Sequence, residues 1–208
     1  MGAPSPRPEP PDAGADAGAD AGGQRGPENH APAAPASGHA RYFIALRPSA
    51  RARRALGALA ASLARRFGGR PIGEHDLHLT LAFIGTAPAS VEPALRESLA
   101  TLEAPGPLSV AQLGHFGPRL LWIGPESTPP WLDGMVHALR GELDRLGVAY
   151  DTRRFSPHLT LVRGARPIVA AALDEAATGL APIASGRMQV RVGASSGAPG
   201  PKRYRWLD

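Results

Sequence analysis

The sequence predicts a mixed fold of helices and strands that is organised as two related halves. One tetrapeptide, His-Leu-Thr-Leu, occurs twice, at residues 78–81 and again 80 residues later at 158–161. Each copy lies in a short apolar run that ends at glycine, 77–85 and 157–164, as a buried strand does. Runs of this kind alternate with stretches of helical apolar periodicity from residue 41 onward.

The elements follow in order from these patterns. A strand is expected at 41–46, and Ser49 then caps a helix that ends at Gly68-Gly69. After the first copy of the motif, a helix is expected from about Ser90. The second half adds strands at 108–113 and 120–124, a helix at 131–146, the second motif, a short helix after Pro167, and closing strands at 188–192 and 204–207. The apolar stripes that predict the three longer helices comprise Leu56, Leu59, Ala60, Leu63 and Phe67; Val91, Leu95, Leu99 and Leu102; and Leu132, Val136, Leu139, Leu143 and Leu146.

The pattern alone leaves the sheet arrangement open. Helices interleaved with strands are typical of a doubly wound parallel sheet, but they also occur in α+β folds. The segment after the first strand, Leu46-Arg47-Pro48-Ser49, is not a glycine-rich phosphate loop.

The repeated motif has a chemical meaning. Successive side chains of a strand point to opposite faces, so His78 and Thr80 share one face, about 6.6 Å apart along the strand. His158 and Thr160 do the same. Two such strands facing each other would form a site with two titratable imidazoles and two hydroxyl donors, which is a proton-transfer site with a place for an anion between its halves. An internal duplication retained for packing would explain the repeated leucines, but gives little reason to keep the polar histidine and threonine.

Several segments resemble the 2H phosphoesterase superfamily, and within it the bacterial RNA 2′,3′-cyclic phosphodiesterases, also called 2′-5′ RNA ligases. The resemblance covers 41–208. It is carried by RYFIAL at 41–46, LHLTLAFIG at 77–85, RLLWIG at 119–124 and FSPHLTLVR at 155–163, whose last residue is Arg163. One departure is the segment GAPGPK at 197–202, which is richer in glycine and proline than the usual turn between the last two strands.

The resemblance implies an α+β fold of two related lobes, each an antiparallel sheet with outer helices, around a central cleft. It implies hydrolysis of a terminal 2′,3′-cyclic phosphate of RNA to a 2′-phosphomonoester, without metal or other cofactor, and reversal would give 2′-5′ ligation. His78 would be the proton donor and His158 the proton acceptor. Thr80, Thr160 and Arg163 would bind the phosphate.

Composition separates a tail, residues 1–39, from the domain at 40–208. The tail contains DAGADAGADAG at 12–22 and many prolines, so we expect it to be disordered. It carries two arginines against five carboxylates, a net charge of −3, which leaves +8 on the remainder. A basic domain suits RNA, although nearly every cation is arginine, as a GC-rich coding bias would also give.

Other features narrow the class of protein. The chain has no cysteine, which excludes thiol chemistry, and it has neither a signal peptide nor an apolar run long enough to span a membrane. We therefore expect a cytoplasmic protein, as a monomer, with RNA as its partner.

His75-x-x-His78 does not place both imidazoles on one strand face, so a zinc site is not expected. Phe43 and Trp122 could each stack a base, but core packing is the more common role of a strand aromatic.

Three alternatives remain open from the sequence. The first keeps the superfamily but changes the substrate to a small cyclic nucleotide, a 2′-5′ oligonucleotide or ADP-ribose cyclic phosphate. The second is a non-catalytic RNA-binding module, and the third is a metal-dependent hydrolase.

Overall fold

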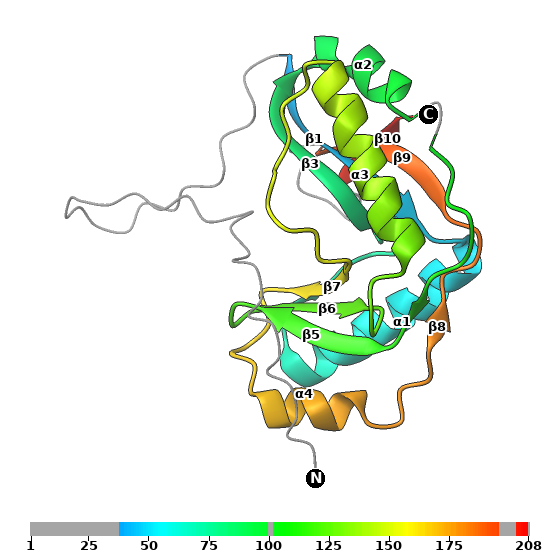
Figure 1. Ribbon diagram of the computed structural model, residues 1–208. Helices are drawn as coiled ribbons and strands as arrows, with labels where there is room; N and C mark the ends of the chain where they lie inside the picture. The colour runs from blue at the N-terminus through cyan, green and yellow to red at the C-terminus, as the bar shows by residue number, and fades with distance from the viewer. Residues whose placement is uncertain (1–37, 100–101, 196–202, 208) are drawn as a thin grey trace, which may run out of the picture.

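The structure, a computed structural model, describes residues 38–99, 102–195 and 203–207 (Figure 1). Nearly all of the predicted tail, 1–37, lies outside these residues, as does the GAPGPK segment. The elements in chain order are β1 (His39–Arg47), α1 (Ala50–Phe67), β2 (Arg70–Pro71), β3 (Leu79–Pro88), the 3₁₀ turn η1 (Ala89–Val91), α2 (Glu92–Glu97), β4 (Ser109–Val110), β5 (Gln112–Phe116), β6 (Leu120–Gly124), α3 (Pro130–Arg145), β7 (Leu159–Arg163), α4 (Ala170–Ala177), β8 (Ile183–Ala184), β9 (Gln189–Ser195) and β10 (Tyr204–Leu207).

The main sheet has eight strands in the order β10-β9-β1-β3-β7-β6-β5, with β2 paired to β7, and β4 and β8 form a separate small sheet. Every described pairing is antiparallel, which confirms the α+β prediction and rules out a doubly wound parallel sheet. The join between β3 and β7 is a single residue pair, Leu79 with Leu159. The sheet therefore divides there into two lobes, which separate in Figure 1.

The two lobes exchange elements, so they are not consecutive halves of the chain. β9 and β10, from the end of the chain, complete the lobe of β1 and β3, whereas β2, from the first half, joins the lobe of β5, β6 and β7. The helices cross over as well, because α1 packs on β7 and β2, and α3 packs on β3. Neither lobe can therefore be assembled from one half of the sequence alone.

The helices form where the apolar stripes predict them. The Ser49 hydroxyl accepts a hydrogen bond from the Ala52 amide, and Gly68 ends α1 with a φ of 73°. The second helix is shorter than expected. α2 ends at Glu97, so Leu99 and Leu102 lie in the loop that follows and pack against the core from there.

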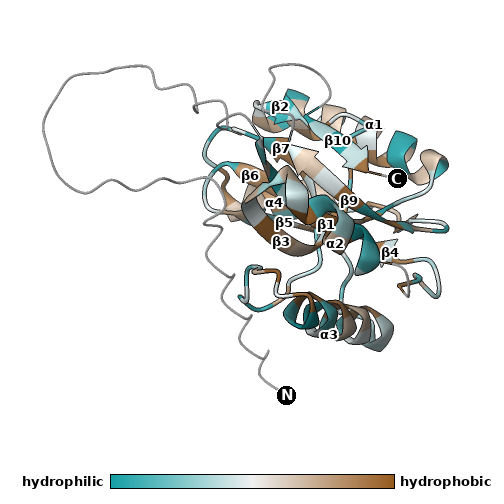
Figure 2. Cartoon of the chain, turned by 90° about the horizontal axis from the view of Figure 1, so that it is seen from above, coloured by the Kyte–Doolittle hydropathy of each residue, from teal (hydrophilic) through white to brown (hydrophobic). Residues whose placement is uncertain are grey.

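A continuous core of leucine, isoleucine and valine lies between the sheet and the helices. Figure 2 shows strand β3 largely brown, and both brown and teal segments along α3, as expected for an amphipathic helix. None of the helices in the described part of the chain is both long and apolar enough to cross a membrane.

Each lobe contains an aromatic ring that lies over a glycine of the neighbouring strand. Phe43 on β1 is paired with Gly193 on β9, and Trp122 on β6 with Gly114 on β5. A Cβ atom at Gly193 would lie 2.2 Å from the Phe43 ring, and one at Gly114 would lie 2.1 Å from the Trp122 ring. The two glycines thus make room for the two rings.

We expect Gly114→Ala to lower the free energy of unfolding by about 1–3 kcal/mol, the usual cost of overpacking, because the Trp122 ring must move. Chemical denaturation monitored by Trp fluorescence would measure the change. Gly141→Ala is the matched control. Gly141 is an exposed residue of α3, and no neighbouring atom lies within 4 Å of its added Cβ. It should gain about 0.5–1 kcal/mol. Equal stability of the two variants would contradict the role assigned to Gly114.

Candidate functional site

The pairing of Leu79 with Leu159 places the two motifs around an approximate two-fold axis. Because the strands are antiparallel, His78 lies across from Thr160, and His158 across from Thr80. All four side chains point away from the leucines, onto one face that we call the site face. The histidines occupy diagonal corners, for which Cα atoms are about 7–8 Å apart.

Each imidazole is oriented by the backbone just before its strand. β3 and β7 begin one residue after the histidines, so the expected strands started slightly too early. His78 Nδ1 lies 2.6 Å from the carbonyl oxygen of Asp76, and His158 Nδ1 lies 2.8 Å from that of Ser156. A carbonyl oxygen only accepts, so Nδ1 carries the proton in both rings. Nε2 is thereby the nitrogen that accepts or donates a proton in chemistry.

Aromatic rings pack against both histidines, which are partly buried. His78 stacks on Phe43 with centroids 4.7 Å apart, and meets Tyr204 and Trp206 of β10 edge-on at 5.2 and 5.5 Å. On the other lobe, the His158 ring lies 4.8 Å from Phe116 and 6.3 Å from Trp122. Phe43 is thus buried, as predicted for a core residue, but it is buried beneath His78.

This packing changes the acidity of both imidazoles. Burial lowers the pKa of His78 to about 4, and the positive charges of Arg163 and His158 act in the same direction. The hydrogen bond to the Asp76 carbonyl and the Asp76 carboxylate oppose this shift. Burial also lowers the pKa of His158, with Arg163 adding to the effect. Without an anion between them, both rings favour the neutral form.

A β-bulge brings Arg163 onto the site face. Strict alternation along β7 would put Arg163 on the side of Leu159 and Leu161. However, Trp122 pairs with Thr160 whereas the next residue back, Leu121, pairs with Val162, so Leu161 is the extra residue. Both Leu161 and Val162 are fully buried, and Arg163 returns to the side of Thr160. Its charge lowers the pKa of both histidines, as expected for a cation close to them.

Two buried donors at the site have no partner among the described residues. They are Nε of Arg163 and the indole Nε1 of Trp122. Buried donors are normally hydrogen-bonded, so these two are available to a ligand that accepts. Donors and a cation near two imidazoles suit an anion with several oxygen atoms.

The same bulge occurs in β3. Ala45 pairs with Thr80 and Ile44 with Ala82, so Leu81 is the extra residue, and the following pair is Phe43 with Phe83. Phe83 therefore occupies in the first lobe the position that Arg163 occupies in the second. Sequence alternation did not identify this residue, although the consecutive buried pairs Leu81-Ala82 and Leu161-Val162 are the signal of a bulge.

Asp76 was also missed by the sequence analysis. Its carboxylate is buried and accepts hydrogen bonds from the Arg203 amide at 2.8 Å and, at 2.9 Å, from Nδ1 of His75. The carbonyl oxygen of His75 in turn accepts from Arg47 at 3.1 Å and from the Trp206 indole at 3.0 Å. This network joins β10 to the loop that carries His78. The second lobe has Ser156 at the equivalent position, without a carboxylate.

The remaining candidates lie apart from this arrangement. His115 hydrogen-bonds the Gly117 carbonyl at a turn, and His137 is exposed on α3. Within the described ranges, no group of three histidine, aspartate or glutamate side chains is arranged to hold a metal ion.

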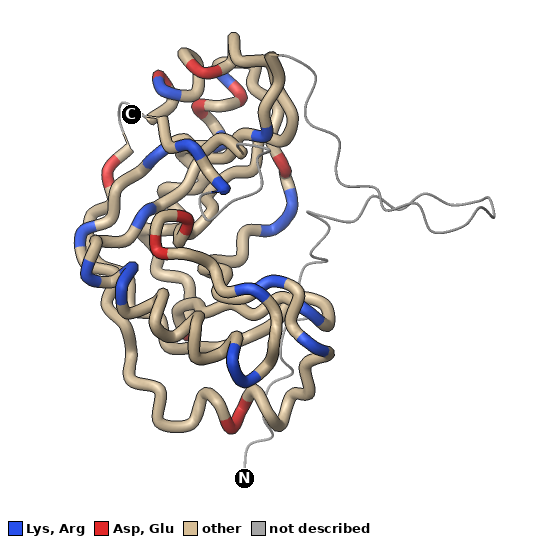
Figure 3. Tube along the Cα trace, turned by 180° about the vertical axis from the view of Figure 1, so that it is seen from behind, with Lys and Arg blue, Asp and Glu red and all other residues tan. Residues whose placement is uncertain are grey.

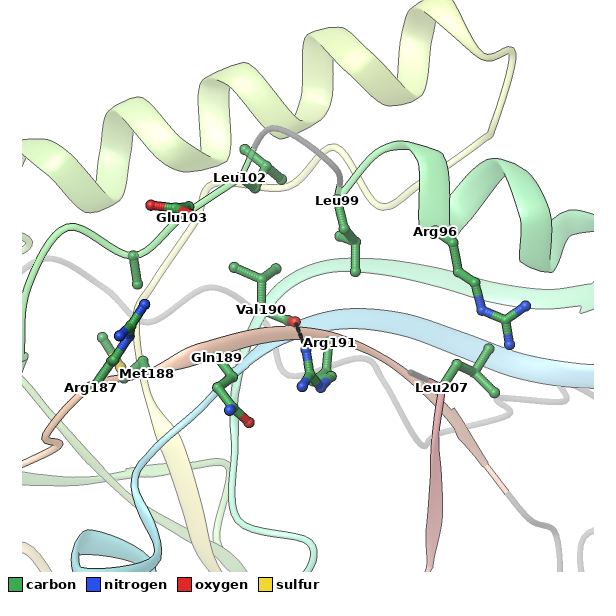
Figure 4. A pocket seen from close by; sticks show the side chains of 11 residues that line it. Arg96, Leu99, Leu102, Glu103, Arg187, Met188, Gln189, Val190, Arg191 and Leu207 are labelled. Carbon is green, nitrogen blue, oxygen red and sulfur yellow. Dashed lines mark hydrogen bonds between the residues drawn. The ribbon is translucent and has the colours of Figure 1, made fainter.

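A cavity of about 590 Å³ lies elsewhere, between the segment after α2 and strand β9 (Figure 4). Arg96, Arg187 and Arg191 line it together with Glu103 and apolar side chains, and none of the paired histidines or threonines does. Figure 3 shows that basic residues occur on both lobes, so positive charge alone does not identify the site.

Comparison with known proteins fits this geometry. The profile of the 2′-5′ RNA ligase superfamily matches residues 38–191. The chain belongs to the 2′-5′ RNA ligase superfamily. Among curated members, the RNA 2′,3′-cyclic phosphodiesterase of Escherichia coli is 36% identical over 103 residues, which are 49% of this chain and 58% of that protein. The enzyme of the same name from Geobacillus stearothermophilus is 31% identical over 134 residues, 59% of this chain and 41% of that protein.

Among solved structures of the superfamily, E. coli LigT complexed with 3′-AMP has a TM-score of 0.64 at 30% identity. That match covers 82% of this chain and 96% of LigT. The curated sequence matches thus span about half of the relatives, whereas the fold is shared over nearly the whole of LigT.

We expect Asp76→Asn to lower the pKa of His78 further, because the variant loses the negative charge that favours its imidazolium form. NMR titration of the imidazole resonances would measure it. His158 is the internal control, since Asp76 is not among the groups that shift its pKa. Equal shifts of both histidines, or no shift, would contradict this electrostatic role.

Proposed function

We propose that this protein hydrolyses a 2′,3′-cyclic phosphate at the end of an RNA chain to a 2′-phosphomonoester. The observation that carries the proposal is the pair of imidazoles at diagonal corners of one site face, each with Nε2 free and a threonine hydroxyl beside it. The relatives named RNA 2′,3′-cyclic phosphodiesterase support it, as does LigT, which was crystallised with a nucleotide.

The reaction needs a base on one side of the phosphorus and an acid on the other. His158 Nε2 takes a proton from water, whose oxygen attacks the phosphorus. The bond from phosphorus to O3′ breaks as His78 Nε2 donates its proton to O3′. The product carries a 2′-phosphate and a 3′-hydroxyl, and the reverse reaction would form a 2′-5′ linkage.

One feature of the structure supports the choice of His78 as the proton donor and His158 as the acceptor. Burial is the largest cause of the lowered His78 pKa, and the Asp76 carboxylate is a smaller influence that opposes it, toward the imidazolium form that a proton donor needs; Ser156 offers His158 a carbonyl but no such charge. Because both pKa values are lowered in the free protein, the negative phosphate must itself raise them on binding. The substrate would thus help to protonate its own acid.

Charge that builds up on the phosphoryl oxygens would be stabilised by fixed donors. Thr80 and Thr160 supply hydroxyl groups, and Arg163 supplies a cation whose Nε is already buried and unpartnered among the described residues. No metal is assigned to any step. The net charge of +8 on residues 40–208 suits an RNA substrate, and we further propose a cytoplasmic monomer.

His78→Ala and His158→Ala should each lower turnover of a 2′,3′-cyclic-phosphate oligonucleotide about 10²–10⁴-fold, because each removes a positioned proton donor or acceptor. The double variant should be far less than multiplicatively worse, since both groups act in one step. Thr80→Val and Thr160→Val should each cost about 1.5–3 kcal/mol of transition-state stabilisation. Product analysis should find only the 2′-phosphate.

His137→Ala is the control, because that imidazole is exposed on α3, and EDTA should leave the rate unchanged. Wild-type turnover together with a collapse of RNA affinity in either site variant would replace this proposal with a binding module. Loss of activity in EDTA would instead favour a metal-dependent hydrolase.

The dependence of kcat/KM on pH should be bell-shaped and displaced to the acid side. The free enzyme needs one imidazole neutral and the other protonated, and both pKa values lie below the ordinary value of about 6.5. Activity should therefore fall as pH rises above 6.5, the ordinary imidazole value. The kcat profile should lie at higher pH, because bound phosphate raises both pKa values. A kcat/KM profile still rising above that value would contradict the burial of the two rings.

A further inference from the structure

A second arginine, Arg70, lies directly beside Arg163 on the site face. The two residues pair across β2 and β7 (Figure 2), and paired residues of a sheet share a face. On its other edge Arg163 pairs with Leu120 of β6, so β2 lies on the edge of β7 that β3 occupies at Leu159. Arg70 therefore borders the join between the two lobes, one strand beyond Arg163.

The backbone around Arg70 is fixed by close contact with β7. Gly69 has a φ of 86°, and a Cβ atom there would lie 2.7 Å from the backbone oxygen of Arg163, so only glycine fits this approach. On the other side of Arg70, the Ile72 amide donates a hydrogen bond of 2.8 Å to the Leu161 carbonyl oxygen. Arg70 is thus presented from a strand that is held on both sides, rather than from a loop.

The two guanidinium groups lack the carboxylates that would offset their charge. Like charges directly opposite each other in a sheet are destabilising. Neither arginine forms an ion pair with a described carboxylate, whereas Arg66, Arg145 and Arg205 each do. Nε of Arg163 is buried without a hydrogen-bond partner in the described residues. Two adjacent cations that oppose folding and have no internal counter-charge fit an anion that comes from outside.

The two arginines differ in their relation to the histidines. The charge of Arg163 lowers the pKa of His78 and of His158, whereas Arg70 is not among the groups that shift either pKa. Arg70 is exposed, and Arg163 is partly buried. Neighbouring strands lie about 4.8 Å apart, so a ligand that reaches Arg70 extends one strand beyond Arg163. The anion that suits Arg70 is therefore separate from a phosphate held between the imidazoles.

We propose that Arg70 binds a backbone phosphodiester of the RNA whose terminal cyclic phosphate lies between the two histidines. The inference rests on the proposed function and deepens it, because an oligonucleotide carries this second phosphate and a nucleoside 2′,3′-cyclic monophosphate does not. Arg70 thereby favours RNA ends over small cyclic nucleotides. A contact with a phosphate carries no sequence information, so the selection is for a chain and not for a base.

Two dinucleotide substrates test this subsite. Both are diadenosines that end in a 2′,3′-cyclic phosphate, and they differ only in the internucleotide linkage, a phosphodiester in one and an uncharged methylphosphonate in the other. In Arg70→Gln, the ratio of kcat/KM for the charged over the neutral substrate should fall about 5- to 15-fold, the lower end for a hydrogen bond to a charged group, because Arg70 is exposed. Arg70→Lys keeps the charge and should lose less.

Arg65→Gln is the matched control. It removes the same charge from an exposed position of α1, the helix that packs on the leucine side of β7, and it should keep the wild-type ratio. A wild-type ratio in Arg70→Gln would overturn the proposal. So would an equal loss on both substrates, which would put Arg70 at the reacting phosphate, or a wild-type protein that does not prefer the charged substrate.

A binding measurement separates this inference from the proposed function. If the wild-type protein hydrolyses neither dinucleotide, the proposed function fails, and calorimetry with the same two molecules at several salt concentrations then decides. In Arg70→Gln, the slope of log Kd against log salt concentration should become shallower by about 0.7 for the phosphodiester, as for loss of one phosphate contact, and should not change for the methylphosphonate. Equal slopes in the two proteins, or no binding of the charged dinucleotide, would overturn the inference.

Discussion

The geometry of the site depends on one backbone pairing, that of Leu79 with Leu159. Because it joins two antiparallel strands at a single point, each histidine is fixed across from the threonine of the other motif. The same pairing is where the sheet divides, so the chemistry lies at the join of the lobes. The exchange of α1 and α3 between the lobes, together with that of β2 and β9, holds this join from both sides. Packing of the outer elements therefore sets the positions of the catalytic candidates.

Burial gives the two imidazoles their chemical state. Each Nδ1 donates to a carbonyl two residues before it, so each ring has one orientation and one free nitrogen. The aromatic rings around them shield part of each imidazole from water and disfavour the imidazolium form. Protonation of His78 therefore opposes folding. The contribution of the neutral ring to stability is complete above the unfolded pKa of about 6.5, and it is lost as pH falls toward the folded pKa of about 4. A phosphate anion bound between the imidazoles would supply the negative charge that favours their protonation.

Much of this site could be predicted from the alternation of side chains along a strand. Arg163 could not be predicted in this way, because it lies beyond a bulge, where the alternation is broken. Alternation correctly puts His78 with Thr80 and His158 with Thr160, because no bulge lies between those residues. One residue later, Leu161 and Val162 are both buried, so position 163 is one step out of phase. The sequence linked Arg163 to the phosphate only through family resemblance. Asp76 was unpredictable for another reason: its partner, the Arg203 amide, is 127 residues away.

Departures from two-fold symmetry would give the symmetric motif a direction. The histidines, threonines and bulges repeat in both lobes, and an enzyme with only these groups could not distinguish the attacking side of a phosphate from the leaving side. Two positions break the equivalence. Asp76 places a carboxylate near His78 where Ser156 places none near His158, and Phe83 stands where the other lobe has Arg163. The two imidazoles thus have different charged neighbours, and the two lobes present different side chains, a ring and a guanidinium, at equivalent positions. Acid–base catalysis needs one proton donor and one proton acceptor. Duplication alone gives two identical groups, so differences of this kind are needed to assign the two roles.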